Sequence, residues 1–503
     1  MEGKFAEFKS RLMEIADLNK ATGLLGWDQR VMMPPAGAAV RAEVLATLGK
    51  IAHEKFTSDE MGKLLEDLRP YEESLPYDSD EASLIRVARR DYEKSVRVPA
   101  SLRAEMSRAS AQAQQVWVEA RQRSDFNHFL PMLERQIELR HRYIECFPPA
   151  EDPYDILLDD YERDMRSAEV QQTFERLKQG LVPLIQLIQG NTDRVSDAPL
   201  HGYFPIEQQK TFCTEVVKHF GFNENSWRLD ATVHPFASSI ATNDIRITTR
   251  YFEDFISPAL FGSMHECGHG LYENGVSPSL ERTLLARGAS LGLHESQSRM
   301  WENLVGRSLS FWKYFYPKLQ QLFPQQFSMI RLEEFYRAIN KVQPSFIRVE
   351  ADEATYNLQF ILRFEIERGM ISGEIPLKDL PEVWNNRFHE YLGLDIPNDS
   401  LGVLQDIHWS MGLIGYFPTY SLGNIISCQI WEKITEAIPD LYQQFERGQF
   451  MPLREWLREN LHKHGRKFTP RETLQKVTGK AEIDVEPYLR YLNTKFSEIY
   501  GLS

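Results

Sequence analysis

Apolar residues recur every three or four positions through most of the first 225 residues, which is the spacing of one face of an α-helix. The pattern is clear over 4–24 and over 36–70, and a segment rich in proline and glycine at 33–37 separates the two ranges. Further helical patterns cover about 80–146, 168–190 and 206–220. We therefore expect an antiparallel helical hairpin at the start of a mainly α protein.

The pattern changes to an extended one over 227–251. Near its end, Asp244, Arg246 and Thr248 fall on one face of a strand, and the isoleucines between them and Thr249 fall on the other. This alternation predicts a small antiparallel β-sheet. An edge strand of such a sheet can bind an extended peptide as an additional strand.

Helical spacing returns from residue 295 to the end, with interruptions near 343–350, 395–420 and 466–472. The whole pattern predicts a mainly α fold, in which the small sheet lies beside a helix with Ser257 as its N-cap, Pro258 in its first turn and a stop at Asn274-Gly275. With 503 residues the chain can form a single domain, 1–503, and the change of pattern indicates two lobes, 1–225 and 226–503.

Composition narrows the range of partners. The net charge of -14 is spread along the chain without a long acidic or basic block, which argues against nucleic acid and against an anionic membrane surface. No apolar run is long enough to span a bilayer, and the amino terminus is charged from Glu2, so we expect a cytoplasmic protein. The four cysteines are scattered and show no C-x-x-C pair, which fits reduced thiols.

The strongest chemical signal is His265-Glu266-Cys267-Gly268-His269, an H-E-x-x-H motif. On a helix, the four-residue spacing brings both imidazoles to one face, where they can bind the same cation. Glu266 is close enough to act as a general base on water without being a ligand. Gly268 costs about 1 kcal/mol in a helix, which indicates that another backbone or a ligand comes close. Cys267 points to the opposite face and is interpreted as a packing residue.

Two histidines leave a zinc-type ion short of one protein ligand. Glu295, in a segment that opens a new helix after His269, is the candidate third ligand. The alternative is an acidic residue that simply favours the first turn of its helix. His294 is a rival ligand, but neighbouring helix residues point about 100° apart, so only one of the two is expected to reach the ion.

Six motifs in order along the chain resemble those of the thermostable (Taq-type) metallocarboxypeptidases. They are His234-Pro-Phe236, Asp244-x-Arg246-x-Thr248, the H-E-C-G-H at 265–269, His294-Glu295-Ser-Gln297, Ile347-Arg348-x-x-Ala351-Asp352 and Gly402-x-x-Gln405-Asp406-x-His408-Trp409. Trp27-Asp28 and Met33-Pro34 also resemble this family, so the similarity covers nearly the whole chain.

The resemblance gives roles to residues outside the metal site. A carboxypeptidase must recognise the free carboxylate of its substrate, and Arg348 stands at a motif position suited to that role, because a guanidinium pairs with a carboxylate through two parallel hydrogen bonds. The alternative is a structural salt bridge with Glu350, Asp352 or Glu353. Arg246 is interpreted as an organiser of the site, held by Asp244.

Transition-state donors are expected further along the chain. His408 and the aromatic run from Tyr416 to Tyr420 stand where related H-E-x-x-H peptidases place groups that stabilise an oxyanion, and His408 and Tyr420 are the candidates. A buried structural histidine and core tyrosines are the alternative. His234 is interpreted as a substrate contact, with a hydrogen-bonding role at a strand end as the alternative.

Together these features predict a metallocarboxypeptidase that releases single C-terminal residues, with one divalent ion, Zn²⁺ or else Co²⁺ or Mn²⁺. The resemblance implies a large helical peptidase fold with a deep cleft, broad specificity and a homodimer. An oligopeptidase or dipeptidyl carboxypeptidase with the same metal chemistry is one alternative. A non-catalytic helical binding module with a structural metal site is another, although a structural site has no use for Glu266.

Overall fold

A computed structural model describes residues 1–502 of the chain. The structure is mainly helical, as predicted, and its packing divides it into two compact units. Unit 1 consists of Met1–Val96, Asp197–Ile339 and Ile430–Glu482, and unit 2 of Arg97–Ser196, Asn340–Gln429 and the residues from Ile483 on. These units differ from the expected lobes 1–225 and 226–503, because each unit collects segments from early, middle and late parts of the chain. No helix in residues 1–502 is both long and apolar enough to cross a membrane.

Unit 1 contains the predicted hairpin, the sheet and the H-E-x-x-H helix. Its helices are α1 (Glu2–Val31), η1 (Pro35–Gly37), α2 (Ala38–Phe56), α3 (Asp59–Asp67), α4 (Arg69–Ser74), α5 (Asp80–Arg97), η3 (Ala198–Leu200), α10 (Ile206–Phe220), α11 (Ser257–Gly275), η4 (Pro278–Leu280), α12 (Leu291–Arg299), η5 (Met300–Val305), α13 (Leu309–Leu322), α14 (Pro324–Phe327), α15 (Leu332–Ile339), α19 (Leu441–Glu446), α20 (Met451–Asn460), η8 (His462–His464) and α21 (Pro470–Thr478).

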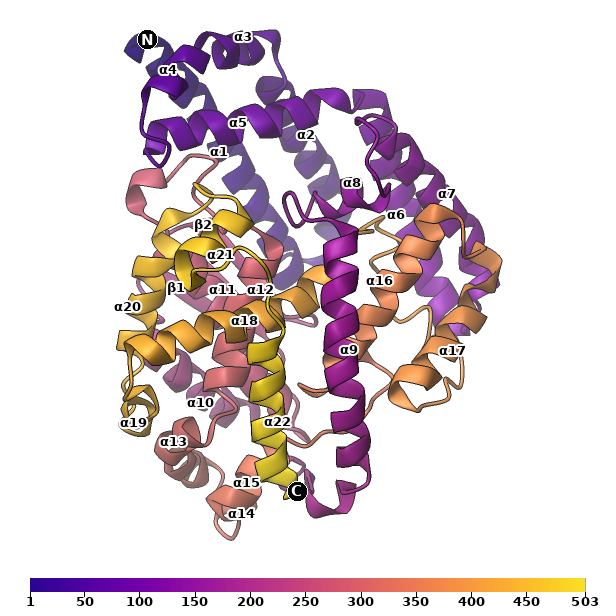
Figure 1. Ribbon diagram of the computed structural model, residues 1–503, viewed down its shortest axis with the longest axis vertical. Coiled ribbons are helices and arrows are strands. Elements are labelled where there is room, and N and C mark those ends of the chain that lie inside the picture. Colours follow the sequence, from indigo (N-terminus) through magenta and orange to yellow (C-terminus); the bar gives the residue numbers. More distant parts are fainter. Residues whose placement is uncertain (503) are drawn as a thin grey trace. The chain divides into compact units, whose positions relative to one another are not determined.

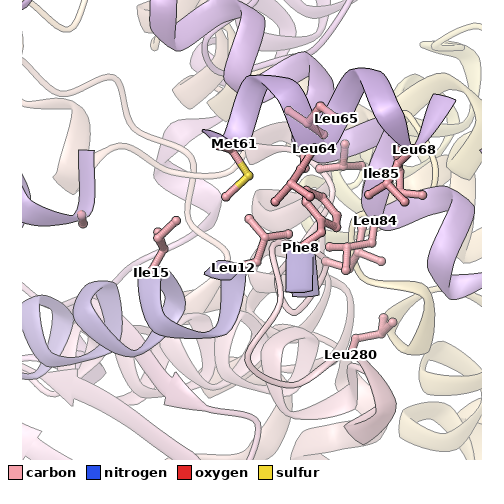
Figure 2. Packing of buried hydrophobic residues seen from close by; sticks show 14 of the residues in the cluster. Phe8, Leu12, Ile15, Met61, Leu64, Leu65, Leu68, Leu84, Ile85 and Leu280 are labelled. Carbon is pink, nitrogen blue, oxygen red and sulfur yellow. The ribbon is translucent and has the colours of Figure 1, made fainter. Parts of the chain in front are cut away.

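One hydrophobic cluster of unit 1 shows why the hairpin docks. Phe8 and Leu12 of α1 are fully buried and pack against side chains from α3 and α5, among them Met61 and Ile85 (Figure 2). Leu280, which lies after α11, joins the same cluster. Burying a large aliphatic or aromatic side chain contributes about 1.5–3 kcal/mol, so this cluster fixes the start of the chain to the segment that follows the H-E-x-x-H helix.

The sheet is small, but it is mixed and not antiparallel. Its strands are β1 (Trp227–Ala231), β2 (Ala237–Ala241) and β3 (Asp244–Thr249), in the order β1-β3-β2. β2 pairs with β3 in the antiparallel direction, whereas β1 runs parallel to β3. Alternation of apolar and polar residues identifies a strand but not the direction of the strand beside it. The parallel pairing of β1 with β3 could therefore not be predicted from the sequence. Ile245 and Ile247 are fully buried, and α11 packs against β3, where a Cβ atom on Gly270 would lie 2.9 Å from the Ile245 side chain.

Unit 2 is helical. Its elements are α6 (Ala100–Arg123), α7 (Phe126–Ile144), α8 (Tyr154–Leu158), α9 (Ser167–Gln189), η2 (Thr192–Arg194), η6 (Arg348–Glu350), α16 (Tyr356–Ser372), η7 (Leu377–Asp379), α17 (Leu380–Leu392) and α22 (Glu486–Tyr500). α6 and α7 lie side by side (Figure 1). α18 (Pro418–Ala437) begins among the unit 2 residues and ends among those of unit 1.

Candidate active site

The H-E-x-x-H segment lies in the middle of α11, as predicted. Pro258 occupies the first turn, where the missing N–H is no loss because no helical acceptor faces it. Ser257 is the first helical residue and not the N-cap; Ile256 takes that position without a side-chain hydrogen bond. The helix ends at Gly275, where a Cβ atom would lie 2.5 Å from that of His462.

Gly268 allows two helix backbones to touch. A Cβ atom at this position would lie 2.6 Å from the carbonyl oxygen of Gln297 and 2.7 Å from Cα of Ser298. The close approach of another backbone, inferred from a glycine inside a helix, is therefore confirmed. Because α12 lies directly on α11, its residue Glu295 faces the two histidines of the motif.

His265, His269 and Glu295 form a compact group whose potential ligand atoms all lie within 4.8 Å of one another. Oε2 of Glu295 is 3.7 Å from Nε2 of His265 and 3.4 Å from Nε2 of His269. Ligands about 2.0–2.1 Å from a tetrahedral zinc ion are about 3.4 Å apart, so the group fits such an ion with little movement. Burial opposes ionisation of Glu295, but the charge of Arg299 and the contacts with His265 and His269 together lower its pKa, so the carboxylate is charged.

A second carboxylate fixes the first histidine. Oε2 of Glu302 lies 2.9 Å from Nδ1 of His265, which leaves Nε2 for the ion. Arg299 donates to Oε1 of Glu295 at 2.7 Å and to Oε2 of Glu302 at 3.1 Å, so one guanidinium aligns both carboxylates. Glu302 lies in η5, a π-helical turn directly after α12, and such turns occur often at functional sites.

His294 lies between His269 and Glu273 and contacts both. Its Nδ1 lies 2.6 Å from Nδ1 of His269, and its Nε2 lies 2.8 Å from Oε1 of Glu273. Both ring nitrogens are therefore occupied by protein groups. Glu295 and not His294 belongs to the group of residues that could hold a metal ion together with His265 and His269.

Glu266 is a buried carboxyl group next to His265. Its side chain is 6% exposed, and within residues 1–502 its carboxylate accepts no hydrogen bond. Burial raises the pKa of Glu266 to about 7, since the charged form loses its hydration. A carboxyl group with a pKa near neutrality is suited to take up and release a proton at physiological pH.

The sheet residues of the candidate set also lie in unit 1. Arg246 donates through Nε and Nη2 to both oxygens of Asp244, at 2.9 Å each, so the expected pair is present. The Arg246 guanidinium and that of Arg228 lie over the ring of Trp27, at 4.6 and 4.7 Å. His234 is exposed on the loop between β1 and β2.

The remaining candidates lie in unit 2, around Arg348. Its Nε donates to Asp406, which also accepts from Nε of the fully buried Arg363 at 2.7 Å. The salt bridge considered for Arg348 thus exists, but with Asp406 and not with the three acids near it in sequence. Within residues 1–502, neither terminal nitrogen of Arg348 donates a hydrogen bond. Burial of Asp406 is outweighed by the charges of Arg363 and Arg348, which lower the pKa of its carboxyl group.

His408 and the two tyrosines are neighbours in the same unit. The ring centroid of His408 lies 4.7 Å from that of Phe417, 5.5 Å from that of Tyr416 and 6.4 Å from that of Tyr420. Burial lowers the pKa of His408 to about 3, so the imidazole is neutral at pH 7. The guanidinium of Arg348 lies 5.2 Å from the Tyr420 ring centroid, which brings the unit 2 candidates into one cluster.

A buried glutamate supports the loop that carries this cluster. Glu367 accepts hydrogen bonds from the hydroxyl group of Tyr154 at 2.7 Å, from the indole of Trp409 at 3.0 Å and from the backbone N–H of Gly415 at 2.9 Å. Trp409 follows His408 and Gly415 precedes Tyr416, so Glu367 holds both ends of the segment between them.

The sequence analysis did not identify several of these site residues. Arg299 and Glu302 follow Glu295 by four and seven residues, a spacing that would have placed all three on one helix face. Glu273 likewise follows His269 by four residues. Asp406 stood inside a motif, but no local signal shows that it contacts Arg348, because 58 residues separate the two.

The match to known proteins is extensive. Residues 7–496 match the family described as Carboxypeptidase Taq (M32) metallopeptidase. This chain belongs to the M32 metallopeptidase family. It is therefore a peptide hydrolase of the carboxypeptidase type, which confirms the enzyme class and the family predicted from the six motifs.

Relatives and solved structures agree with the M32 assignment. The chain is 41% identical over 497 residues to thermostable carboxypeptidase 1 of Thermus thermophilus, covering 97% of both chains. It is 38% identical over 496 residues to carboxypeptidase 1 of Bacillus subtilis, covering 99% of this chain and 98% of the relative. The crystal structure of an M32 carboxypeptidase from Deinococcus radiodurans superposes with a TM-score of 0.96 at 38% identity, covering 99% of this chain and all of that one.

Proposed function

We propose that this chain is a metal-dependent carboxypeptidase that releases single amino acids from the C-terminal end of peptides with broad specificity. The observation that carries the proposal is the buried Glu266, without a hydrogen-bond partner in the described chain, next to a group of three ligand residues. A structural metal site fills its fourth position with protein and needs no base. This arrangement favours a catalytic site over a structural one.

His265, His269 and Glu295 would hold one divalent ion. Two imidazoles and one carboxylate are the donor set of catalytic zinc sites, so we propose Zn²⁺, with Co²⁺ or Mn²⁺ as substitutes. When bound, the ion supplies Lewis acidity, which polarises the scissile carbonyl group and makes water more acidic.

Glu266 acts as the general base and then as the general acid. It takes a proton from the attacking water and delivers it to the nitrogen of the departing amino acid. Its burial keeps bulk water away, and its pKa of about 7 lets one carboxyl group serve both steps near neutral pH. The cycle leaves Glu266 in its starting state, so no further proton carrier is required.

Arg348 binds the carboxylate that marks the end of the substrate. Asp406 holds its Nε, so the outer edge of the guanidinium keeps two N–H groups for a carboxylate with two oxygens. Arg363 shares Asp406 and is fully buried, so this support is rigid.

The other unit 2 candidates serve the transition state. We assign His408 and Tyr420 as hydrogen-bond donors to the oxyanion, with Tyr416 beside them, and one such donor is worth about 3–4 kcal/mol. The neutral state of His408 leaves it one N–H to give. In unit 1, His234 contacts substrate from its exposed loop, and Asp244 keeps Arg246 in place.

Mass spectrometry of digested peptides tests the function. One peptide is incubated with the protein as the free acid and as the C-terminal amide, each with and without a chelator. The proposal predicts a ladder of single-residue losses from the free acid alone, stopped by the chelator. Internal cleavage that occurs equally in the free acid and in the amide would indicate an oligopeptidase. Successive losses of two residues would indicate a dipeptidyl carboxypeptidase.

Assembly and location are part of the same proposal. We expect a homodimer, as the family resemblance implies, and a cytoplasmic protein that acts on soluble peptides. Analytical ultracentrifugation of the purified chain checks the first expectation. Fractionation of the source cells checks the second.

A further inference from the structure

Two half-buried residues next to the metal group, Glu273 and His294, have no role in the proposed chemistry. Glu273 lies on α11 four residues after His269, and His294 lies on α12 next to Glu295. His294 bridges the two helices, because one of its nitrogens faces His269 and the other faces Glu273.

The hydrogen atoms of this chain can be assigned from Glu273 outward. Oε1 of Glu273 accepts from the backbone N–H of Gly288 at 2.9 Å and lies 2.8 Å from Nε2 of His294. Burial opposes ionisation of Glu273, but the hydrogen bonds from His294 and Gly288 and the nearby positive charge together lower the pKa of Glu273. A carboxylate has no proton to donate, so Nε2 of His294 carries the hydrogen in this contact.

The contact with His294 then determines which nitrogen of His269 carries a hydrogen. When Nε2 carries the one hydrogen of the His294 imidazole, Nδ1 has a bare lone pair, and this atom lies 2.6 Å from Nδ1 of His269. Two nitrogens at that distance share a hydrogen that one of them donates, so His269 carries its hydrogen on Nδ1. Its Nε2 is then bare, and this is the nitrogen 3.4 Å from Glu295.

The ring of His294 is held in place by packing. A Cβ atom on Gly288 would lie 2.8 Å from Cδ2 of His294, and the ring centroid of Tyr272 lies 5.2 Å away on a tilted ring. The hydroxyl group of Tyr272 accepts from the backbone N–H of Ala289 at 3.2 Å, so the same short segment, Gly288–Ala289, positions both rings. A ring confined in this way keeps its two nitrogens facing His269 and Glu273.

We propose that Glu273 and His294 are positioning residues that fix His269 in the tautomer with hydrogen on Nδ1, so that its Nε2 is ready to bind the ion. The inference rests on the proposed metal site. Metal-binding histidines usually donate directly to a carboxylate, a backbone carbonyl or water, as His265 does to Glu302. For His269, the imidazole of His294 lies between the proposed ligand and the carboxylate of Glu273.

Two substitutions of His294 separate positioning from packing. His294→Phe keeps a ring against Tyr272 but removes the acceptor, whereas His294→Gln offers a carbonyl oxygen that can accept from His269. The readout is the dissociation constant for Zn²⁺ added to the metal-free full-length chain, measured by competition with a chromophoric chelator. His294→Phe should weaken zinc binding by about 10- to 100-fold, and His294→Gln should restore it to within a few-fold of wild type.

A spectroscopic readout checks the tautomer itself. In the zinc-loaded chain labelled with ¹⁵N-histidine, the His269 signals should show a protonated Nδ1. The matched control is His219→Phe, the same substitution at a half-buried histidine of α10 that is not part of the metal group. This variant should bind zinc as tightly as wild type. If His294→Phe does not fold, Glu273→Met and Glu273→Gln form the equivalent pair, with loss of affinity expected only for Glu273→Met.

The outcomes distinguish this inference from the proposed function. Wild-type zinc affinity in His294→Phe, or a His269 with bare Nδ1, would overturn the relay while leaving the carboxypeptidase intact. A wild-type chain that binds no zinc and releases no amino acids would contradict the proposed function itself.

Discussion

The carboxylate of Glu302 lies 2.9 Å from Nδ1 of His265, at the ring edge away from the nitrogen that faces Glu295. Arg299 and Arg307 lie at the same carboxylate, so its charge is balanced by protein groups. We predict that Glu302→Gln weakens zinc binding by about 10- to 100-fold, because an amide gives a weaker acceptor to His265 and removes one of the two carboxylates that Arg299 contacts.

The measurement is zinc affinity by chelator competition. Glu446→Gln is the matched control, since Glu446 forms an ion pair with Lys313 at the surface. Equal zinc affinity in Glu302→Gln and in the control would show that Glu302 does not support the metal group.

Gly268 makes a prediction about packing. Gly268→Ala should lower the free energy of unfolding by about 1–3 kcal/mol and weaken zinc binding, because the new methyl group meets the backbone of α12, which cannot give way as a side chain would. Gly49→Ala in α2 is the control, since nothing lies within 4 Å of its Cβ position, and it should stabilise by about 0.5–1 kcal/mol. A Gly268→Ala protein as stable as the control variant would mean that α12 does not lie on α11 as described.

Arg348 makes a prediction about substrate recognition. Lysine offers a single ammonium in place of two parallel N–H groups, so Arg348→Lys should lower kcat/KM for peptides with a free carboxylate by about 10- to 100-fold, the worth of one charged hydrogen bond. Zinc affinity should stay unchanged. Arg368→Lys, where the arginine pairs with Asp152, is the control from the same unit. An unchanged kcat/KM in Arg348→Lys would leave Arg348 with a structural role only.

The common face of the two motif histidines was predictable because its information is local. The four-residue spacing of His265 and His269 places both on one helix face. Gly268 indicated that another backbone comes close, and in the structure this is the backbone of α12. The ion pair of Asp244 and Arg246 was predictable for the same reason, since residues two apart on a strand share a face.

What the sequence left open depends on contacts between distant segments. Asp406 reaches Arg348 across 58 residues, and Glu367 reaches Gly415 across 48, so no periodicity connects either pair. The lobes expected at 225/226 did not match the compact units, because units assembled from separated segments leave no boundary in the order of the residues.

Glu367 makes a prediction about pH. Burial raises the pKa of Glu367 to about 7, although three groups donate hydrogen bonds to its carboxylate. The folded protein therefore keeps a proton on Glu367 at pH values where the unfolded chain, with a pKa near 4.5, has released it. Between these values the native state holds more protons, and stability falls as pH rises. A shift from 4.5 to about 7 corresponds to about 3 kcal/mol.

The comparison with Glu367→Gln isolates this effect, because glutamine does not titrate. The unfolding temperature of wild type relative to Glu367→Gln should fall progressively from pH 5 to pH 8. A difference that stays flat over this range, or that grows with pH, would show that Glu367 is ionised throughout.

The most direct test of the account is Glu266→Gln, with zinc content and peptide cleavage measured on the same preparation. Because Glu266 is not a ligand, the variant should bind one zinc ion as tightly as wild type. Because an amide cannot take a proton from water, the ladder of single-residue losses should slow by about 10²- to 10⁴-fold. A zinc-loaded Glu266→Gln protein that produces the ladder at the wild-type rate would contradict the assignment of Glu266 as the base.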